Sequence, residues 1–119
     1  MPDQSLESDS SAALVEQIAE QALEKKAEDI ISLDVNELTS LTDFFLICSA
    51  DTEPQIKAIC DNIRKGTNSK PWHIEGYEKL HWVLLDYIDV VVHVFRTTER
   101  EYYSLEKLWA DAPQREFTN

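Results

Sequence analysis

The spacing of apolar positions predicts three helices. From residue 11 to residue 26, apolar side chains recur every three or four positions and glutamates fill many of the positions between them, as in an amphipathic helix. Thr52 and Gln55 have the spacing of a capping box, and so do Thr98 and Glu101. Each pair precedes a run with helical periodicity, so each predicts the start of a further helix.

Five segments between these helices are rich in β-branched and aromatic residues, which predicts strands. They are Asp29–Val35, Asp43–Ser49, Pro71–Glu75, Trp82–Leu85 and Val90–Phe95. Strands joined by short connections usually pair antiparallel. The element order is α-β-β-α-β-β-β-α, and it predicts an α/β protein with a mixed five-stranded sheet and helices packed on it.

The last two strands form the most informative part of the chain, the sequence WVLLDYIDVVVHVF from Trp82 to Phe95. The acidic interruption Asp86–Asp89 is too short for a crossover, so the two arms must form an antiparallel hairpin. Charged side chains rarely lie in a core without partners. We therefore expect some polar groups of this hairpin to face outward, on a surface that contacts another molecule.

Length and charge limit the classes of partner. A chain of 119 residues is expected to form one domain, here residues 10–119, after a flexible acidic tail at residues 1–9. Eleven basic residues against 23 acidic ones give a net charge of −12, which disfavours direct binding to nucleic acid. The same charge favours encounter with a basic protein. Acidity that serves only solubility is the alternative.

The remaining composition predicts a soluble cytoplasmic protein without a metal or cofactor. Cys48 and Cys60 have no second cysteine or histidine at zinc-binding spacing, and we expect both to be buried in a reducing compartment. The first eleven residues are polar and lack the apolar segment of a signal peptide. No apolar run reaches the length of a membrane span.

Catalysis has weak support in the sequence. Asp86 and Asp89 resemble the paired carboxylates that hold metal ions in phosphoryl transfer. Such sites commonly bind phosphates at a glycine-rich turn, whereas the turn Ser49–Glu53 places carboxylates there. Neither cysteine has a cationic neighbour in sequence, and His93, inside VVVHVF, is better explained as a structural histidine.

Binding has better support. Trp82 and Tyr87 are amphipathic aromatic residues of the type enriched in interfaces, and Asp86, Asp89 and Glu75 lie near them. Such a cluster suits a basic, partly apolar patch on another protein. Core packing of Trp82 with a solvated acidic turn explains the same residues, so the pattern alone leaves both interpretations open.

A family resemblance decides between them. The stretches EDIISLDV and LTDFFLICSA within Glu28–Ala50, WVLLDYIDVVVHVF, and REYYSLEKLWADAP at Arg100–Pro113 match in order and spacing. Over Leu14–Pro113 the chain resembles the ribosomal silencing factor family, also called RsfS or Iojap. The resemblance implies a nucleotidyltransferase-like fold that lacks catalytic residues.

The activity implied by this resemblance is binding and not catalysis. Family members dock on the large ribosomal subunit through ribosomal protein L-fourteen and sterically block the joining of the subunits. They thereby repress translation under nutrient limitation, and they also form homodimers. No cofactor is implied. The alternative is a metal-dependent nucleotidyltransferase-like enzyme.

The resemblance also marks the expected partner-binding residues. The contact ribbon comprises Trp82, Leu84, Asp86, Tyr87 and Asp89, supported by Asp43, Phe44, Glu75 and His93. The family usually has LLDYGDVVVH, whereas this chain has Ile88 at the glycine position. If the turn requires a positive φ, isoleucine is strained there. If the turn is of an ordinary type, no strain is expected.

Overall fold

The computed structural model describes the backbone of residues 4–118 and the side chains from residue 10. The predicted tail at residues 1–9 lies partly outside this range and stays a prediction, although the first helix starts earlier than expected, at Gln4. The elements are α1 (Gln4–Glu24), β1 (Glu28–Asp34), β2 (Phe44–Ala50), α2 (Glu53–Gly66), β3 (His73–Glu75), β4 (Trp82–Asp86), β5 (Val90–Arg96), α3 (Thr97–Tyr103), α4 (Leu105–Leu108) and β6 (Gln114–Phe117).

The strands form one mixed sheet in the order β3-β4-β5-β2-β1-β6. β2 and β5 pair in parallel, and the other neighbours are antiparallel, including the predicted β4–β5 hairpin. The prediction of an α/β mixed sheet is confirmed, but the sheet within residues 4–118 has six strands and not five. β6 was not predicted from the sequence because it is a short edge strand, QREF, with its first three residues exposed. Such a strand needs no apolar alternation.

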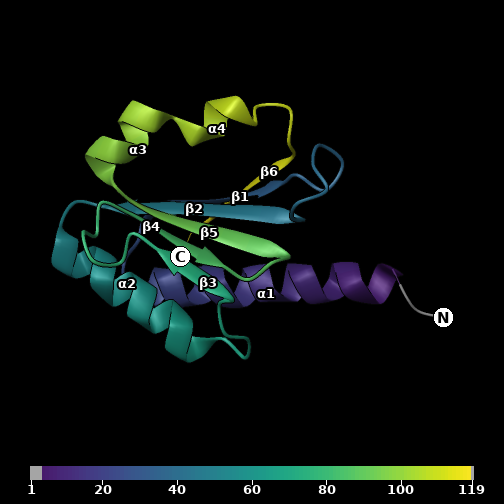
Figure 1. Cartoon of the computed structure of the whole chain (residues 1–119), viewed down its shortest axis with the longest axis horizontal. Coiled ribbons are helices and arrows are strands. Elements are labelled where there is room, and N and C mark those ends of the chain that lie inside the picture. Colours follow the sequence, from purple (N-terminus) through teal and green to yellow (C-terminus); the bar gives the residue numbers. More distant parts are fainter. Residues whose placement is uncertain (1–3, 119) are drawn as a thin grey trace.

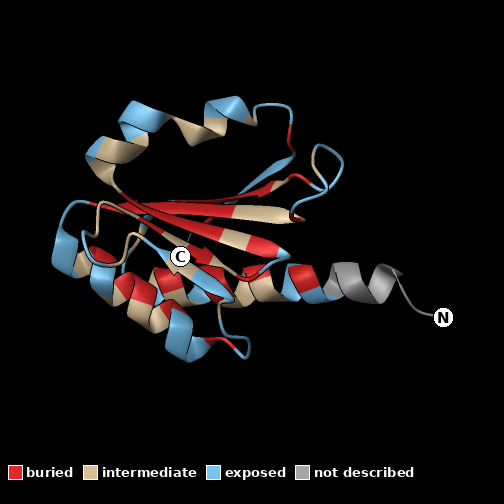
Figure 2. Ribbon diagram, in the orientation of Figure 1, coloured by how far each residue is buried: buried red, intermediate tan, exposed pale blue. Residues whose placement is uncertain are grey.

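The sheet separates two layers of helices. In Figure 1, α1 and α2 cover one face, while α3 and α4 lie over the other. The first layer encloses the larger core, in which Ile18 and Ile59 from the helices meet Val83, Leu85 and Val92 from the strands. The second layer covers a smaller cluster. Figure 2 shows buried residues along the central strands and exposed ones over much of α3 and α4.

The helix starts differ from the two predicted capping boxes. At α2 the main-chain N–H of Gln55 donates to Thr52 Oγ1 at 3.3 Å, which confirms that cap. At α3 no side chain of the described residues caps the helix, and Thr98 Oγ1 instead donates to Glu99 Oε1 at 2.7 Å. Ser104, with φ +47°, then separates α3 from the single turn of α4, so the predicted long helix is two short ones.

Both cysteines lie in the core between the sheet and the helices, as expected. Burial raises the pKa of the Cys48 thiol to about 12, so the thiol stays protonated and unreactive at neutral pH. Within residues 4–118, no helix is long and apolar enough to cross a membrane.

Candidate functional site

The face of the sheet that carries α3 and α4 is only partly covered, and the uncovered part forms a groove of about 570 Å³. Burial alternates along β4, so Val83 and Leu85 enter the core while Leu84 faces the groove. In the sheet register Leu84 lies opposite His93 on one side and Glu75 on the other, which places all three on this face. The lining residues are Thr39, Leu41, Thr42, Phe45, Trp72, Leu84, Asp86, Ile88, Val91, His93, Leu105 and Trp109.

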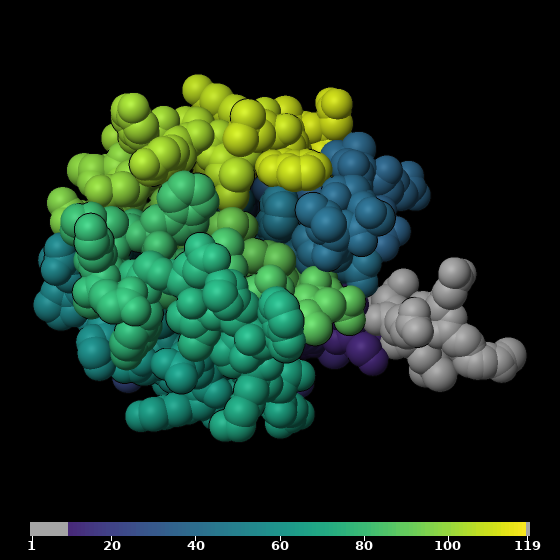
Figure 3. Space-filling model, in the orientation of Figure 1, coloured from purple at the N-terminus to yellow at the C-terminus, as the bar shows by residue number. Residues whose placement is uncertain are grey.

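Three exposed apolar side chains surround the groove. Leu41 is 84% exposed, Trp72 75% and Ile88 56%, and each comes from a different loop. The Trp72 loop is held to the hairpin because the Trp72 N–H donates to the carbonyl of Asp86 at 2.7 Å. Figure 3 shows the segments near residues 40, 72 and 88, in blue, teal and green, below the yellow C-terminal helices. Large apolar groups gathered at one exposed place mark an interaction surface.

The structure brings several predicted site residues together. Leu84, Asp86 and His93 line the groove, Glu75 lies on its outer edge and Asp89 is exposed at the adjoining turn. Trp82 is half-buried. The centroid of its ring lies 4.7 Å from the ring centroid of Phe95 and 4.9 Å from that of Tyr103. Trp82 therefore supports the fold at one end of this face.

Three other predicted site residues lie elsewhere. Tyr87 is only 7% exposed and belongs to the core on the opposite face, where its hydroxyl lies 3.5 Å from Thr67 Oγ1. Phe44 packs against the same core. Asp43 is half-buried, and its Oδ2 accepts a hydrogen bond from Ser11 Oγ at 2.9 Å. Strand alternation explains the first two positions, because consecutive residues cannot all face one side.

Several lining residues were not predicted from the sequence. Phe45 and Val91 lie opposite each other across β2 and β5, so knowledge of the register would have revealed them. Leu41 and Trp72 come from loops without a periodic pattern, and only the tertiary structure brings them to the groove. Trp109 reaches it from the end of α4 and meets Phe45 edge-on at 5.1 Å.

His93 forms the polar part of the groove floor. Its Nδ1 accepts a hydrogen bond from Trp82 Nε1–H at 3.1 Å, which leaves the ring proton of the neutral form on Nε2. Nε2 is buried and has no partner among the described residues. Burial lowers the pKa of His93 to about 4, so the imidazole is neutral at physiological pH.

Acid is therefore expected to destabilise the protein through His93. Its pKa is about 4 in the fold against an ordinary 6.5, so the unfolded chain takes up a proton that the folded chain excludes. The neutral His93 therefore makes its full contribution to the free energy of unfolding above about pH 6.5. This contribution is lost as the pH falls toward 4, and the free energy of unfolding then drops by up to about 3 kcal/mol. Urea denaturation at a series of pH values measures it. His93→Gln should flatten this dependence, and equal slopes for both proteins would contradict the assignment.

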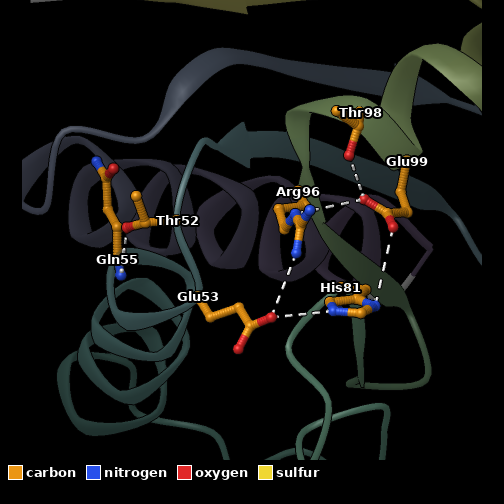
Figure 4. Close-up of polar contacts among 7 residues, drawn as sticks. All are labelled: Thr52, Glu53, Gln55, His81, Arg96, Thr98 and Glu99. Atoms are coloured by element: carbon orange, nitrogen blue, oxygen red, sulfur yellow. Dashed lines mark hydrogen bonds and ion pairs between the residues drawn. The ribbon is translucent and has the colours of Figure 1, made fainter.

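A polar cluster lies at the start of α2, beside the end of β5. Figure 4 shows Glu53, at the start of α2, facing Arg96 and His81, with Glu99 on their other side. Arg96 Nη1 lies 3.3 Å from Glu53 Oε2, and His81 Nε2 lies 3.0 Å from the same oxygen. Arg96 Nε lies 3.7 Å from Glu99 Oε1. Both carboxylates here pair with Arg96 of the chain itself, which ties α2 to the end of β5.

Asp86 of the hairpin also has a structural role. Asp86 Oδ1 accepts a hydrogen bond from the N–H of Ile88 at 2.7 Å, which shapes the turn. In the part of the chain that the structure describes, no group of three or more His, Cys, Asp or Glu residues is placed to hold a metal ion.

Comparison with known proteins points to one family. Residues 8–119 match the family model described as "RsfS: Ribosomal silencing factor during starvation". A ribosomal silencing factor RsfS from Halalkalibacterium halodurans is 47% identical over 93 residues, covering 76% of this chain and 80% of that protein. A crystal structure from Chromobacterium violaceum has a TM-score of 0.80 at 33% identity and covers 83% of this chain and 85% of its own. One from Bacillus halodurans has a TM-score of 0.78 at 39% identity, covering 89% and 99%.

Proposed function

Because the chain belongs to the ribosomal silencing factor family, we propose that it binds ribosomal protein L-fourteen on the large ribosomal subunit and blocks subunit joining. The family consists of regulatory proteins and not enzymes, so the chain is a regulatory protein with the ribosome as its partner. Repression of translation follows from this block, and the family description places such silencing under starvation.

The observation that carries this proposal is the apolar groove with acidic residues at its edge. Leu84 and Val91 supply apolar floor, and Asp86, Asp89 and Glu75 place carboxylates in or beside it. The chain as a whole has a net charge of −12. Proteins that contact ribosomal RNA are generally basic, so such a protein is attracted by this charge while exposed RNA is repelled. The groove thus suits a protein and disfavours direct binding to RNA.

The proposed mechanism is steric and needs no chemical step. The body of the molecule measures 45 × 30 × 28 Å. A rigid body of that size, docked on the face where the large subunit meets the small one, leaves no room for the second subunit. Five of the twelve residues that line the groove lie on strands of the sheet, so this part of the surface is preorganised and loses little conformational freedom on binding.

Further properties belong to the same proposal. We place the action in the cytoplasm, where the subunits join, and expect a homodimer when the protein is free. We also expect a nucleotidyltransferase-like fold that has lost catalysis. The ion pairs of Glu53 and Glu99 with Arg96 agree with this expectation, because they leave these carboxylates engaged within the chain. Of the predicted contact residues, Leu84, Asp86, Asp89 and Glu75 lie in or beside the groove, with His93 and Trp82 beneath or next to it.

Sedimentation with purified large subunits tests the proposal. The protein is expected to pellet with large subunits, and small subunits added afterwards should form fewer joined ribosomes than they do without it. Small subunits added first should protect the joined ribosome. Failure to pellet with large subunits contradicts the proposal. A rise in melting temperature with nucleoside triphosphates and magnesium would instead support the enzyme alternative.

A further inference from the structure

The turn between β4 and β5 holds Ile88 in a conformation that isoleucine rarely adopts. Its φ is +76°. Asp86 Oδ1 accepts a hydrogen bond from the Ile88 N–H at 2.7 Å, and the Tyr87 carbonyl accepts one from the Asp89 N–H at 2.9 Å. The second bond closes a γ-turn around Ile88, the rare and strained form of this turn when φ is positive. A β-branched residue at positive φ is an outlier, so strain is concentrated at this position.

Packing within the fold does not account for isoleucine here. The Ile88 side chain is 56% exposed, whereas Tyr87 is 7% exposed and Val90 is fully buried. An exposed side chain contributes little burial energy to compensate for a strained backbone. Glycine fits this conformation without strain, and asparagine tolerates it far better than a β-branched residue does. Strained residues that persist at a binding surface point to a role in binding.

We propose that Ile88 is a specificity-determining anchor, an apolar side chain that the strained turn presents to the docking partner. This inference rests on the function proposed above. Ile88 lines the same groove as Leu41 and Trp72, which are also largely exposed. Asp86 and Asp89 lie on either side of it in sequence. The matching surface is therefore an apolar recess between basic side chains on the large-subunit protein.

The proposal requires folding stability and affinity to change in opposite directions. Ile88→Gly removes the strain and the anchor together, so the unfolding midpoint should rise while the affinity for large subunits falls about tenfold. Ile88→Asn keeps a side chain of similar length but makes it polar, and the same two changes are expected. A residue with only a structural role would not weaken binding when its replacement stabilises the fold.

A matched control separates relief of strain from loss of contact. Lys26 also has a positive φ, +62°, but it is exposed at the end of α1, which covers the other face of the sheet. Lys26→Gly should raise the unfolding midpoint and leave affinity within about twofold. Affinity is measured by titrating each labelled protein with purified large subunits, and stability by urea denaturation.

The outcomes distinguish this inference from the proposed function. If the unchanged chain binds large subunits and Ile88→Gly binds equally well, the anchor is contradicted and the proposed function stands. If the unchanged chain does not bind, the proposed function fails and the anchor fails with it. Weaker binding by Ile88→Gly together with lower stability would also contradict the inference, because the turn would then not be strained.

Discussion

Leu84→Lys is expected to weaken binding to large ribosomal subunits by at least about 100-fold, as for a central interface residue. Leu84 faces the groove, whereas Val83 and Leu85 on either side of it in β4 are buried in the core. The Leu84 side chain is therefore available to a partner and is not needed by the core. Lysine there would add a desolvation cost and place a positive charge against the basic partner proposed above. Titration with purified large subunits measures the loss. The urea midpoint should stay close to that of the unchanged protein.

The choice of position matters for this experiment. Trp82 is the more obvious target, but its contacts with Phe95 and Tyr103 mean that its truncation also damages the fold. The matched control is Leu108→Lys, since Leu108 is 75% exposed on α4 and does not line the groove. That variant should bind normally. Normal binding by Leu84→Lys would show that the partner uses another surface.

Arg100→Met is expected to lower the free energy of unfolding by about 3 kcal/mol, the typical cost of breaking a largely buried ion pair. The Arg100 side chain is only 11% exposed. Its Nη1 donates to the carbonyl of Asp29 at 2.7 Å and to Ser49 Oγ at 3.0 Å, and its Nε donates to Glu106 Oε2 at 2.9 Å. One guanidinium therefore joins α3 to β1, β2 and α4, and its removal leaves the Glu106 carboxylate without its cation.

Urea denaturation of matched variants tests this prediction. Arg100→Lys should recover only part of the loss, because an ammonium cannot reproduce the planar fork of the guanidinium. Arg115→Met removes another arginine–glutamate pair, with Glu16, but the Arg115 side chain is 60% exposed. That change should cost less than about 1 kcal/mol. If the two methionine variants lost similar amounts of unfolding free energy, the buried contacts of Arg100 would not contribute the stability predicted here.

Local rules predicted the elements whose stability is local. The capping residue Thr52 and the β4–β5 hairpin were found because each depends on residues close in sequence. The strand β6 was missed because pairing with β1 creates it, and its own sequence, QREF, has little preference for a strand. The break at Ser104 was missed for a similar reason, since helical spacing on both sides hides the left-handed residue between them.

The groove was only partly predictable. The sequence pointed to the hairpin, and Leu84, Asp86 and His93 do line the groove. Tyr87 lies in the same core as Leu85 because side chains two positions apart in an extended chain face the same side. The predicted contact ribbon took consecutive residues and did not apply this alternation. Leu41 and Trp72 enter through loops whose positions depend on the whole fold. The conformation of Ile88 required the backbone itself.

The pairing of β6 with β1 affects the order in which the groove can form. Ile30 lies opposite Phe117, so this ladder joins the first strand in sequence to the last one described. Contacts between residues so distant in sequence slow folding, because a long loop must close before they form. Leu105 and Trp109, which line the groove, lie between β5 and β6 in sequence. The groove is therefore expected to be completed late in folding, after β6 has paired with β1.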